Sequence, residues 1–279
     1  MLLARSICDR LHVHAPWYLL HEVVLMGLPM AVLLFEVYPK LSKGSKLSFI
    51  ATSATFISSS AIAEIIAIQN RYWWFYTGND PLSGLELGTV PIEEFLSYPM
   101  LLNLPVLFYL WLGAHFGPEQ PAAFTAQTQR TLKALALAAA GLGGYCLFRA
   151  LTVHTPSLDL ATLPAPDAAG AIRYTAGPKQ LGWTLVQALG WAGTLMLMVK
   201  AHARTAMRRL GFVAACYFAY SFFVELLACG RGWWVWNTEQ TLGVFALVLP
   251  VESFSMYLTG ALMPVLFFEL IRPAFSTAD

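Results

Sequence analysis

The sequence predicts an all-α integral membrane protein with about seven transmembrane helices, built as two parallel three-helix repeats joined by an extra helix. Its composition is 57% hydrophobic and only 12% charged, whereas soluble domains carry about 25% charged residues. Seven apolar stretches approach the length of about 20 residues that a helix needs to cross a bilayer. One unusual block of residues also occurs twice in the chain, and internal repeats of this kind reveal architecture.

The predicted spans alternate with short loops whose basic residues gather on one side of the membrane. The spans are residues 17–38, 46–68, 91–114, 131–152, 181–200, 208–228 and 245–270. With seven crossings, ten basic residues share one side: Lys40, Lys43, Lys46, Arg130, Lys133, Lys200, Arg204, Arg208, Arg209 and Arg272. The positive-inside rule makes this side cytoplasmic. We therefore expect a protein of a bacterial-type cell membrane with a cytoplasmic C-terminus.

The extra crossing divides the chain into three predicted regions. Residues 1–115 form the first repeat with spans one to three, residues 116–180 a connector with span four and an ordinary loop, and residues 181–279 the second repeat with spans five to seven. Three-span units joined directly would be inverted, and the additional crossing restores a common orientation. The repeats would then be related by a pseudo-two-fold axis along the membrane normal, and we expect a shared site near that axis.

The repeated block combines tryptophans, a proline and glutamates. The first copy contains Trp73-Trp74, Tyr76 and Pro91-x-Glu93-Glu94-Phe95-x-x-Tyr98, and the second contains Trp233-Trp234, Trp236 and Pro250-x-Glu252-Ser253-Phe254-x-x-Tyr257. A further glutamate, Glu64 or Glu225, precedes each tryptophan pair. Each repeat therefore brings acids and aromatic rings into a hydrophobic segment.

Glutamates within predicted spans are the candidate reactive groups. A charged group at the centre of a bilayer costs about 2.5–3.5 kcal/mol on insertion scales, so such residues face the interior of the bundle. Glu93, Glu252 and Glu94 follow a proline that suits a first helical turn, and a protonated carboxyl in a dry aromatic pocket is a general acid. Adjacent side chains project about 100° apart on a helix, so Glu93 and Glu94 should not face the same ligand.

Other intramembrane glutamates have less specific interpretations. Glu36 and Glu269 lie near the cytoplasmic edge, where an interfacial position explains them. Glu22 follows His21 within span one, and this pair is either structural or a proton relay.

The aromatic residues have two interpretations. Tryptophan and tyrosine gather at membrane interfaces as anchors. Alternatively, their rings line a pocket and stabilise a cation through their faces, worth about 0.5–2 kcal/mol each. The repetition in register with the glutamates favours a pocket with this lining: Trp73, Trp74, Tyr76, Phe95, Tyr98, Trp233, Trp234, Trp236, Phe254 and Tyr257.

Several classes of chemistry have no motif in this chain. No G-x-G-x-x-G fingerprint follows a predicted strand, and the six histidines and four cysteines show no metal-ligand spacing. We therefore expect neither a flavin or nicotinamide cofactor nor a metal. The net charge of +1 indicates no nucleic-acid partner.

The doubled block resembles the membrane-integral, two-repeat lycopene cyclase family of carotenoid biosynthesis, in its fused, single-chain form. The resemblance rests on Trp73-Trp74, Gly84 and Pro91-x-Glu93-Glu94-x-x-Ser97, echoed by Trp233-Trp234, Gly243 and Pro250-x-Glu252. The family often carries a second acid in both halves, whereas this chain has Ser253, so the two halves differ.

The resemblance implies a non-redox cyclisation of a linear carotene such as lycopene, a lipophilic polyene dissolved in membrane lipid. A general acid protonates the terminal double bond, the neighbouring double bond closes on the cation, and a base removes a proton to leave an ionone-type ring, of which the β ring is our expectation. Glu93 and Glu252 would share this work across one pocket, with Glu94 third and with Glu64 and Glu225 in support. The resemblance also implies contact with other enzymes of carotenoid synthesis.

Two alternatives stay open from the sequence. One is another acid-catalysed polyene or terpenoid reaction, such as hydration or isomerisation. The other is a small-molecule membrane transporter with carboxylates near the bilayer midplane.

Overall fold

The computed structural model describes residues 17–75, 85–87, 90–117, 119–121, 123–153, 173–174, 178–231 and 233–276. Over these residues, seven helical segments are long and apolar enough to cross a membrane. The first span is composite, and its parts are α2 (Trp17–Glu22), η1 (Val23–Gly27), α3 (Leu28–Val37) and η2 (Tyr38–Lys40). The other six are α4 (Lys43–Gln69), α5 (Ile92–Phe116), α6 (Ala126–Thr152), α7 (Gly182–Ala201), α8 (Met207–Gly230) and α9 (Val251–Phe275).

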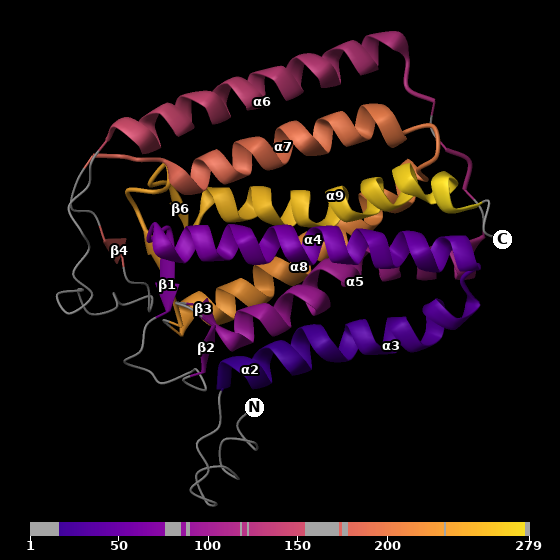
Figure 1. Ribbon diagram of the computed structural model, residues 1–279, viewed down its shortest axis with the longest axis horizontal. Helices are drawn as coiled ribbons and strands as arrows, with labels where there is room; N and C mark the ends of the chain where they lie inside the picture. The colour runs from indigo at the N-terminus through magenta and orange to yellow at the C-terminus, as the bar shows by residue number, and fades with distance from the viewer. Residues whose placement is uncertain are drawn as a thin grey trace, which may run out of the picture.

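Short strands lie at one end of the helical bundle, opposite the end that holds the C-terminus (Figure 1). They are β1 (Trp73–Phe75), β2 (Glu86–Leu87), β3 (Val90–Pro91), β4 (Arg173–Tyr174), β5 (Trp234–Asn237), β6 (Phe245–Ala246) and β7 (Leu249–Pro250). Two expectations need correction here. The last span begins at Val251 and not at residue 245, because β6 and β7 pair as a tight hairpin before it. Within the connector 116–180, where an ordinary loop is expected after span four, β4 pairs with β5.

The strands β1 and β5 join the two halves of the chain. They pair antiparallel around the central pair Trp74–Val235, with Trp73 opposite Trp236 and Phe75 opposite Trp234. A two-fold axis perpendicular to two equivalent strands relates them in this antiparallel sense. The tryptophan-rich segments of both repeats therefore lie at the same end of the bundle.

The helices pack in pairs that repeat the same symmetry. The contacts of α4 with α5 and of α3 with α5 correspond to those of α8 with α9 and of α7 with α9. The inner helices α5 and α9 contact one another, and each carries a buried proline, Pro105 or Pro264, at positions 159 apart. The extra helix α6 lies outside this arrangement, packed along α7 (Figure 1).

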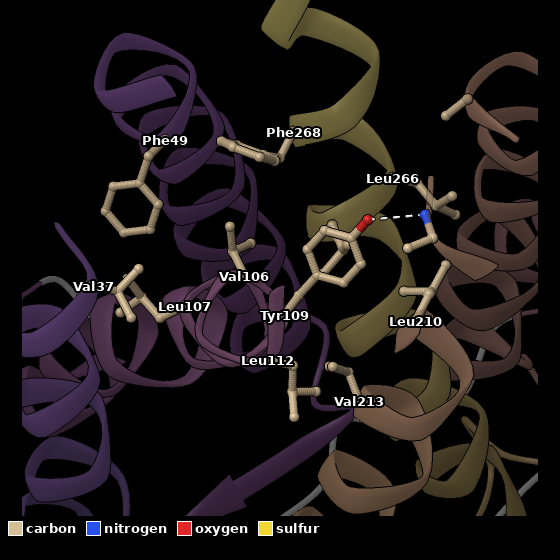
Figure 2. Close-up of a cluster of buried hydrophobic side chains, with 13 residues drawn as sticks. Val37, Phe49, Val106, Leu107, Tyr109, Leu112, Leu210, Val213, Leu266 and Phe268 are labelled. Atoms are coloured by element: carbon tan, nitrogen blue, oxygen red, sulfur yellow. Dashed lines mark hydrogen bonds between the residues drawn. The ribbon is translucent and has the colours of Figure 1, made fainter. Parts of the chain in front are cut away.

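The half of the bundle away from the strands is filled by apolar side chains from several helices (Figure 2). Leu107, Leu266 and Phe268 are fully buried there. The backbone N–H of Ala206 donates to the hydroxyl oxygen of Tyr109 at 3.0 Å, which ties the α7–α8 turn to α5. At the same end, the carboxylate of Glu119 accepts from the backbone N–H groups of Arg208 and Arg209, at 3.0 and 3.1 Å, and so caps α8.

This packing predicts unequal costs for two leucine truncations. Leu107→Ala should lower the free energy of unfolding by about 2–5 kcal/mol, because it opens a cavity in a closely packed region. Leu137→Ala, on the outer surface of α6 where Leu137 is 74% exposed, should change it little. Thermal unfolding of the purified protein in detergent measures both, and equal midpoints for the two variants would contradict the packing described.

The distribution of basic residues predicts the membrane orientation. A cysteine in place of Lys40, at the end away from the strands, should react with an impermeant maleimide only after the membrane is opened. A cysteine in place of Leu242, at the strand end and 51% exposed, should react in intact cells. The reverse pattern, measured in a cysteine-free background, would overturn the predicted cytoplasmic side.

Candidate active site

A cavity of about 380 Å³ lies between the two repeats, in the half of the bundle nearer the strands. This volume is within the range of small-molecule pockets, about 300–1,000 Å³. Its walls come from the first span and from α4, α5, α7, α8 and α9. Four carboxyl side chains line it: Glu22, Glu64, Glu94 and Glu225.

Equivalent residues of the two repeats face each other across the cavity. Glu64 and Glu225 both line it, as do Tyr98 and Tyr257. The same holds for two further pairs, Ser60 with Ser221 and Phe56 with Tyr217. The pseudo-two-fold axis therefore passes through the cavity, and both repeats build one shared site.

Three indole rings form the end of the cavity beneath the paired strands. The ring of Trp73 lies 4.7 Å from that of Trp183 and 5.4 Å from that of Trp236, and the last two are 5.7 Å apart, measured between centroids. Gly182 allows the ring of Tyr72 to pack close to the start of α7, because a Cβ at position 182 would lie 2.3 Å from that ring. The same burial raises the pKa of Tyr72.

Each carboxyl group of the cavity has a defined setting. Glu64 accepts a hydrogen bond from the indole N–H of Trp73 at 2.9 Å. Glu225 accepts from the hydroxyl of Ser253 at 3.1 Å and from that of Tyr257. Glu94 accepts from the hydroxyl of Tyr18. These bonds orient the carboxyl groups before any ligand arrives.

Glu22 reaches the cavity from an irregular part of the first span. It is fully buried, and the π-helical turn Val23–Gly27 follows it directly. Such turns are rare and occur frequently at functional sites.

The structure separates Glu93 from Glu94. Both occupy the first turn of α5, as expected. Glu94 lines the cavity, whereas Glu93 is fully buried outside its lining. The angle between adjacent helical positions explains this difference.

Glu252 also lies outside the cavity lining. Its carboxylate accepts from the hydroxyl of Thr184 at 2.8 Å and from the backbone N–H of Leu242 at 2.6 Å. Nearby, the ammonium group of Lys179 donates to the Thr238 carbonyl at 2.5 Å. Burial lowers the pKa of Lys179, and the charges of Glu252 and Glu239 oppose that shift. Glu252 thus ties α7 to the loop before β6, and the expectation that it faces Glu93 across one pocket does not match this geometry.

The predicted aromatic residues divide between the cavity and its surroundings. Trp73, Tyr98, Trp236 and Tyr257 line it. Trp233 instead packs edge-on against Tyr18 and His21, at 5.9 and 5.4 Å between centroids. Phe95 and Phe254 also lie outside the lining. Phe95 packs on Tyr98, and Phe254 packs on Phe218 and Phe222. Tyr76 and the side chains of Trp74 and Trp234 lie outside the described residues.

Sequence reasoning missed two residues of the site, Tyr18 and Trp183. Neither belongs to the repeated block, because each stands near the start of the first helix of its repeat. The sequence does hold a signal for Trp183, because this residue stands next to Gly182 at the beginning of a span. Tyr18 carries no comparable signal, because it contacts Glu94 over 76 positions of sequence.

Among the described residues, no three His, Cys, Asp or Glu side chains are arranged to hold a metal ion. What the cavity offers is a set of carboxyl groups beside aromatic faces, in a mainly apolar enclosure inside a membrane-spanning bundle. This arrangement suits proton transfer to and from an apolar ligand.

Comparison with known families matches this architecture. A family model described as lycopene cyclase matches residues 15–112 and 182–271, which together make up more than half of the chain and include both repeats but not α6. No match was found among curated proteins or among solved structures. The two matched regions together contribute both the carboxyl groups and the indole rings of the cavity. The chain belongs to the lycopene cyclase family.

Proposed function

We propose that this protein closes the linear end group of a lycopene-type carotene into an ionone-type ring, as a β ring, by acid catalysis without redox chemistry. One observation carries the proposal. In a chain of the lycopene cyclase family, four carboxyl groups and three indole rings surround one cavity inside the membrane-spanning bundle.

The carboxyl cluster supplies the proton. Within the described residues, no lysine or arginine lines the cavity. Four carboxylates without a countercharge in an apolar enclosure would be very costly, so the cluster retains protons. A retained proton is what the first step requires, because protonation of the terminal double bond creates a tertiary cation.

The proton donor in this proposal is Glu94. Its carboxyl group is held by the Tyr18 hydroxyl and borders the cavity. Glu225 lies on the opposite repeat and accepts two hydroxyl hydrogen bonds, a setting that suits a negatively charged partner. After the neighbouring double bond forms the new carbon–carbon bond, Glu225 takes the proton that leaves, so protons balance and the product is an isomer of the substrate. Glu93 and Glu252 would support this pair as positioning residues.

The aromatic rings protect and stabilise the cation. The faces of Trp73, Trp183 and Trp236 present negative electrostatic potential to a cation, worth about 0.5–2 kcal/mol for each ring. They also help to exclude water, which would otherwise capture the cation as an alcohol. Stabilisation of a developing charge by a preorganised site is a large part of enzymatic rate enhancement.

The proposal predicts which glutamates are required. In a lycopene-accumulating host, the unaltered protein should convert the linear pigment to a cyclic one. Glu94→Gln and Glu225→Gln should each lower cyclisation by about 10²–10⁴-fold, the usual contribution of general acid–base catalysis. Pigment chromatography measures the products, and immunoblots of membranes confirm that the variants accumulate.

Three further variants complete that experiment. Glu93→Gln and Glu252→Gln should reduce cyclisation less, because neither carboxyl borders the cavity. Glu36→Gln, at the opposite end of the bundle, serves as the control for loss of a carboxyl. A larger loss of cyclisation in Glu93→Gln than in Glu94→Gln would indicate that Glu93 is the proton donor. Failure of the unaltered protein to cyclise the pigment would remove the proposed function itself.

A second prediction concerns the indole rings. Trp183→Leu should lower the rate of cyclisation by about 2–30-fold, the equivalent of 0.5–2 kcal/mol, and should release some hydrated carotene. Trp111→Leu, at the other end of α5, should have neither effect. Mass analysis of the pigments detects the added water, and an unchanged rate and product in Trp183→Leu would exclude a role for this ring.

A further inference from the structure

We propose that the linear carotene reaches the cavity sideways from the bilayer, through a gap between α4 and α7, and that the equivalent gap between the first span and α8 is closed. This inference rests on the proposed function and adds the route by which the substrate enters. It follows from comparing equivalent positions of the two repeats.

The cavity wall is open on the α4 side and closed on the α8 side. Ser60 and Ala63 of α4 are half-buried, whereas their equivalents Ser221 and Val224 of α8 are buried. Ser59 also lines the cavity and is exposed. Both α4 and α7 pack against α9, and α9 lies between them in Figure 1. The inner helix α9 thus forms the back of the gap.

The equivalent gap holds a plug of side chains. Met26, Met100 and Val224 form a buried apolar cluster, against which Leu101 and Tyr220 pack. The hydroxyl of Tyr220 donates to the Leu25 carbonyl and so bridges α8 to the first span. Outside this plug lies a separate apolar groove, lined by residues such as Val32 and Cys216. Tyr220 of the plug lines this groove, and Tyr217 lines both the groove and the cavity, so these two rings lie between the groove and the carboxyl groups.

Three plug residues have smaller equivalents in the open gap. The equivalents of Tyr220 and Val224, 161 positions earlier, are Ser59 and Ala63, and the equivalent of Met100, 159 positions later, is Thr259. Two glycines face these sites. A Cβ on Gly27 would lie 2.7 Å from the sulfur of Met100, whereas one on Gly190 would meet only the Thr259 side chain, with Oγ1 at 3.8 Å and Cγ2 at 4.0 Å. The gap between the first span and α8 is filled by side chains in contact, whereas the gap between α4 and α7 has space for a side chain.

The open gap lies at the depth where a carotene dissolves. Gly190 and Thr259 each stand eight residues into their helices, about 12 Å from the helix start at 1.5 Å per residue. This depth approaches the middle of a hydrocarbon layer about 30 Å thick. An apolar end group would thus enter without crossing the headgroups, and a single gap admits one end group at a time.

The test transfers the plug to the open gap. In Ser59→Tyr/Thr259→Met, the two larger residues of the closed gap replace their equivalents. Gly190→Leu provides a second, independent obstruction at a position with space for a side chain. If the gap is then open about a tenth of the time, capture of the carotene should fall about tenfold. Val32→Phe/Cys216→Met adds bulk in the separate groove and should leave the rate unchanged.

Two readouts keep this inference distinct from the proposed function. The first is the rate of cyclic pigment formation in membranes. The second is the amount of linear carotene that copurifies with each variant when Glu94→Gln is also present, which reports access without turnover. Reduced values for both obstructed proteins, with unchanged thermal unfolding, would support the gap.

The contrary results are equally specific. If both obstructed variants cyclise and retain carotene as the unaltered protein does, the substrate does not use this gap, and the proposed function stands. If the unaltered protein forms no cyclic pigment, the proposed function fails, and copurification alone decides the route. Equal amounts of carotene on obstructed and control proteins would then overturn it.

Discussion

The antiparallel ladder between β1 and β5 is the interaction on which the rest of the structure depends. It joins segments about 160 positions apart and fixes the relation of one repeat to the other. Because the ladder stands on the pseudo-two-fold axis, the inner helices α5 and α9 meet below it, and the space between them receives side chains from both halves. Trp73 and Trp236 occupy paired positions of the same ladder, and their indole rings close one end of that space.

The symmetry of the backbone contrasts with the chemistry of the side chains. Of the four carboxyl groups in the cavity, Glu22, Glu64 and Glu94 come from the first repeat and Glu225 alone from the second. At the position equivalent to Glu94 stands Ser253, which donates to Glu225 instead of bearing an acid of its own. A symmetric frame thus carries an asymmetric site, which a reaction needs if one side gives a proton and the other side accepts it.

The sequence predicted the seven spans, the repeats and the common side of the tryptophan segments, because hydropathy and repetition are properties of residue type alone. It also singled out the repeated block, from which Glu94, Trp73, Tyr98, Trp236 and Tyr257 line the cavity. It could not show that Glu94, and not Glu93, borders the cavity, since that depends on the rotation of α5 about its axis. Nor could it find Tyr18 or separate Trp233 from Trp236, because contacts across helices and the pairing of β1 with β5 decide which side chains reach the cavity.

The π-helical turn Val23–Gly27 changes which side chains the first span presents to the cavity. Such a turn accommodates one residue more than a regular helix does, and one residue corresponds to a rotation of about 100°. Everything before the turn, including Tyr18 and Glu22, is therefore out of phase with the part of the span that follows. The part of the span after the turn packs on α5. The part before the turn directs the Tyr18 phenol and the Glu22 carboxyl toward the cavity. A change of helical phase, and not a new helix, is enough to give one half of the protein a different set of reactive groups.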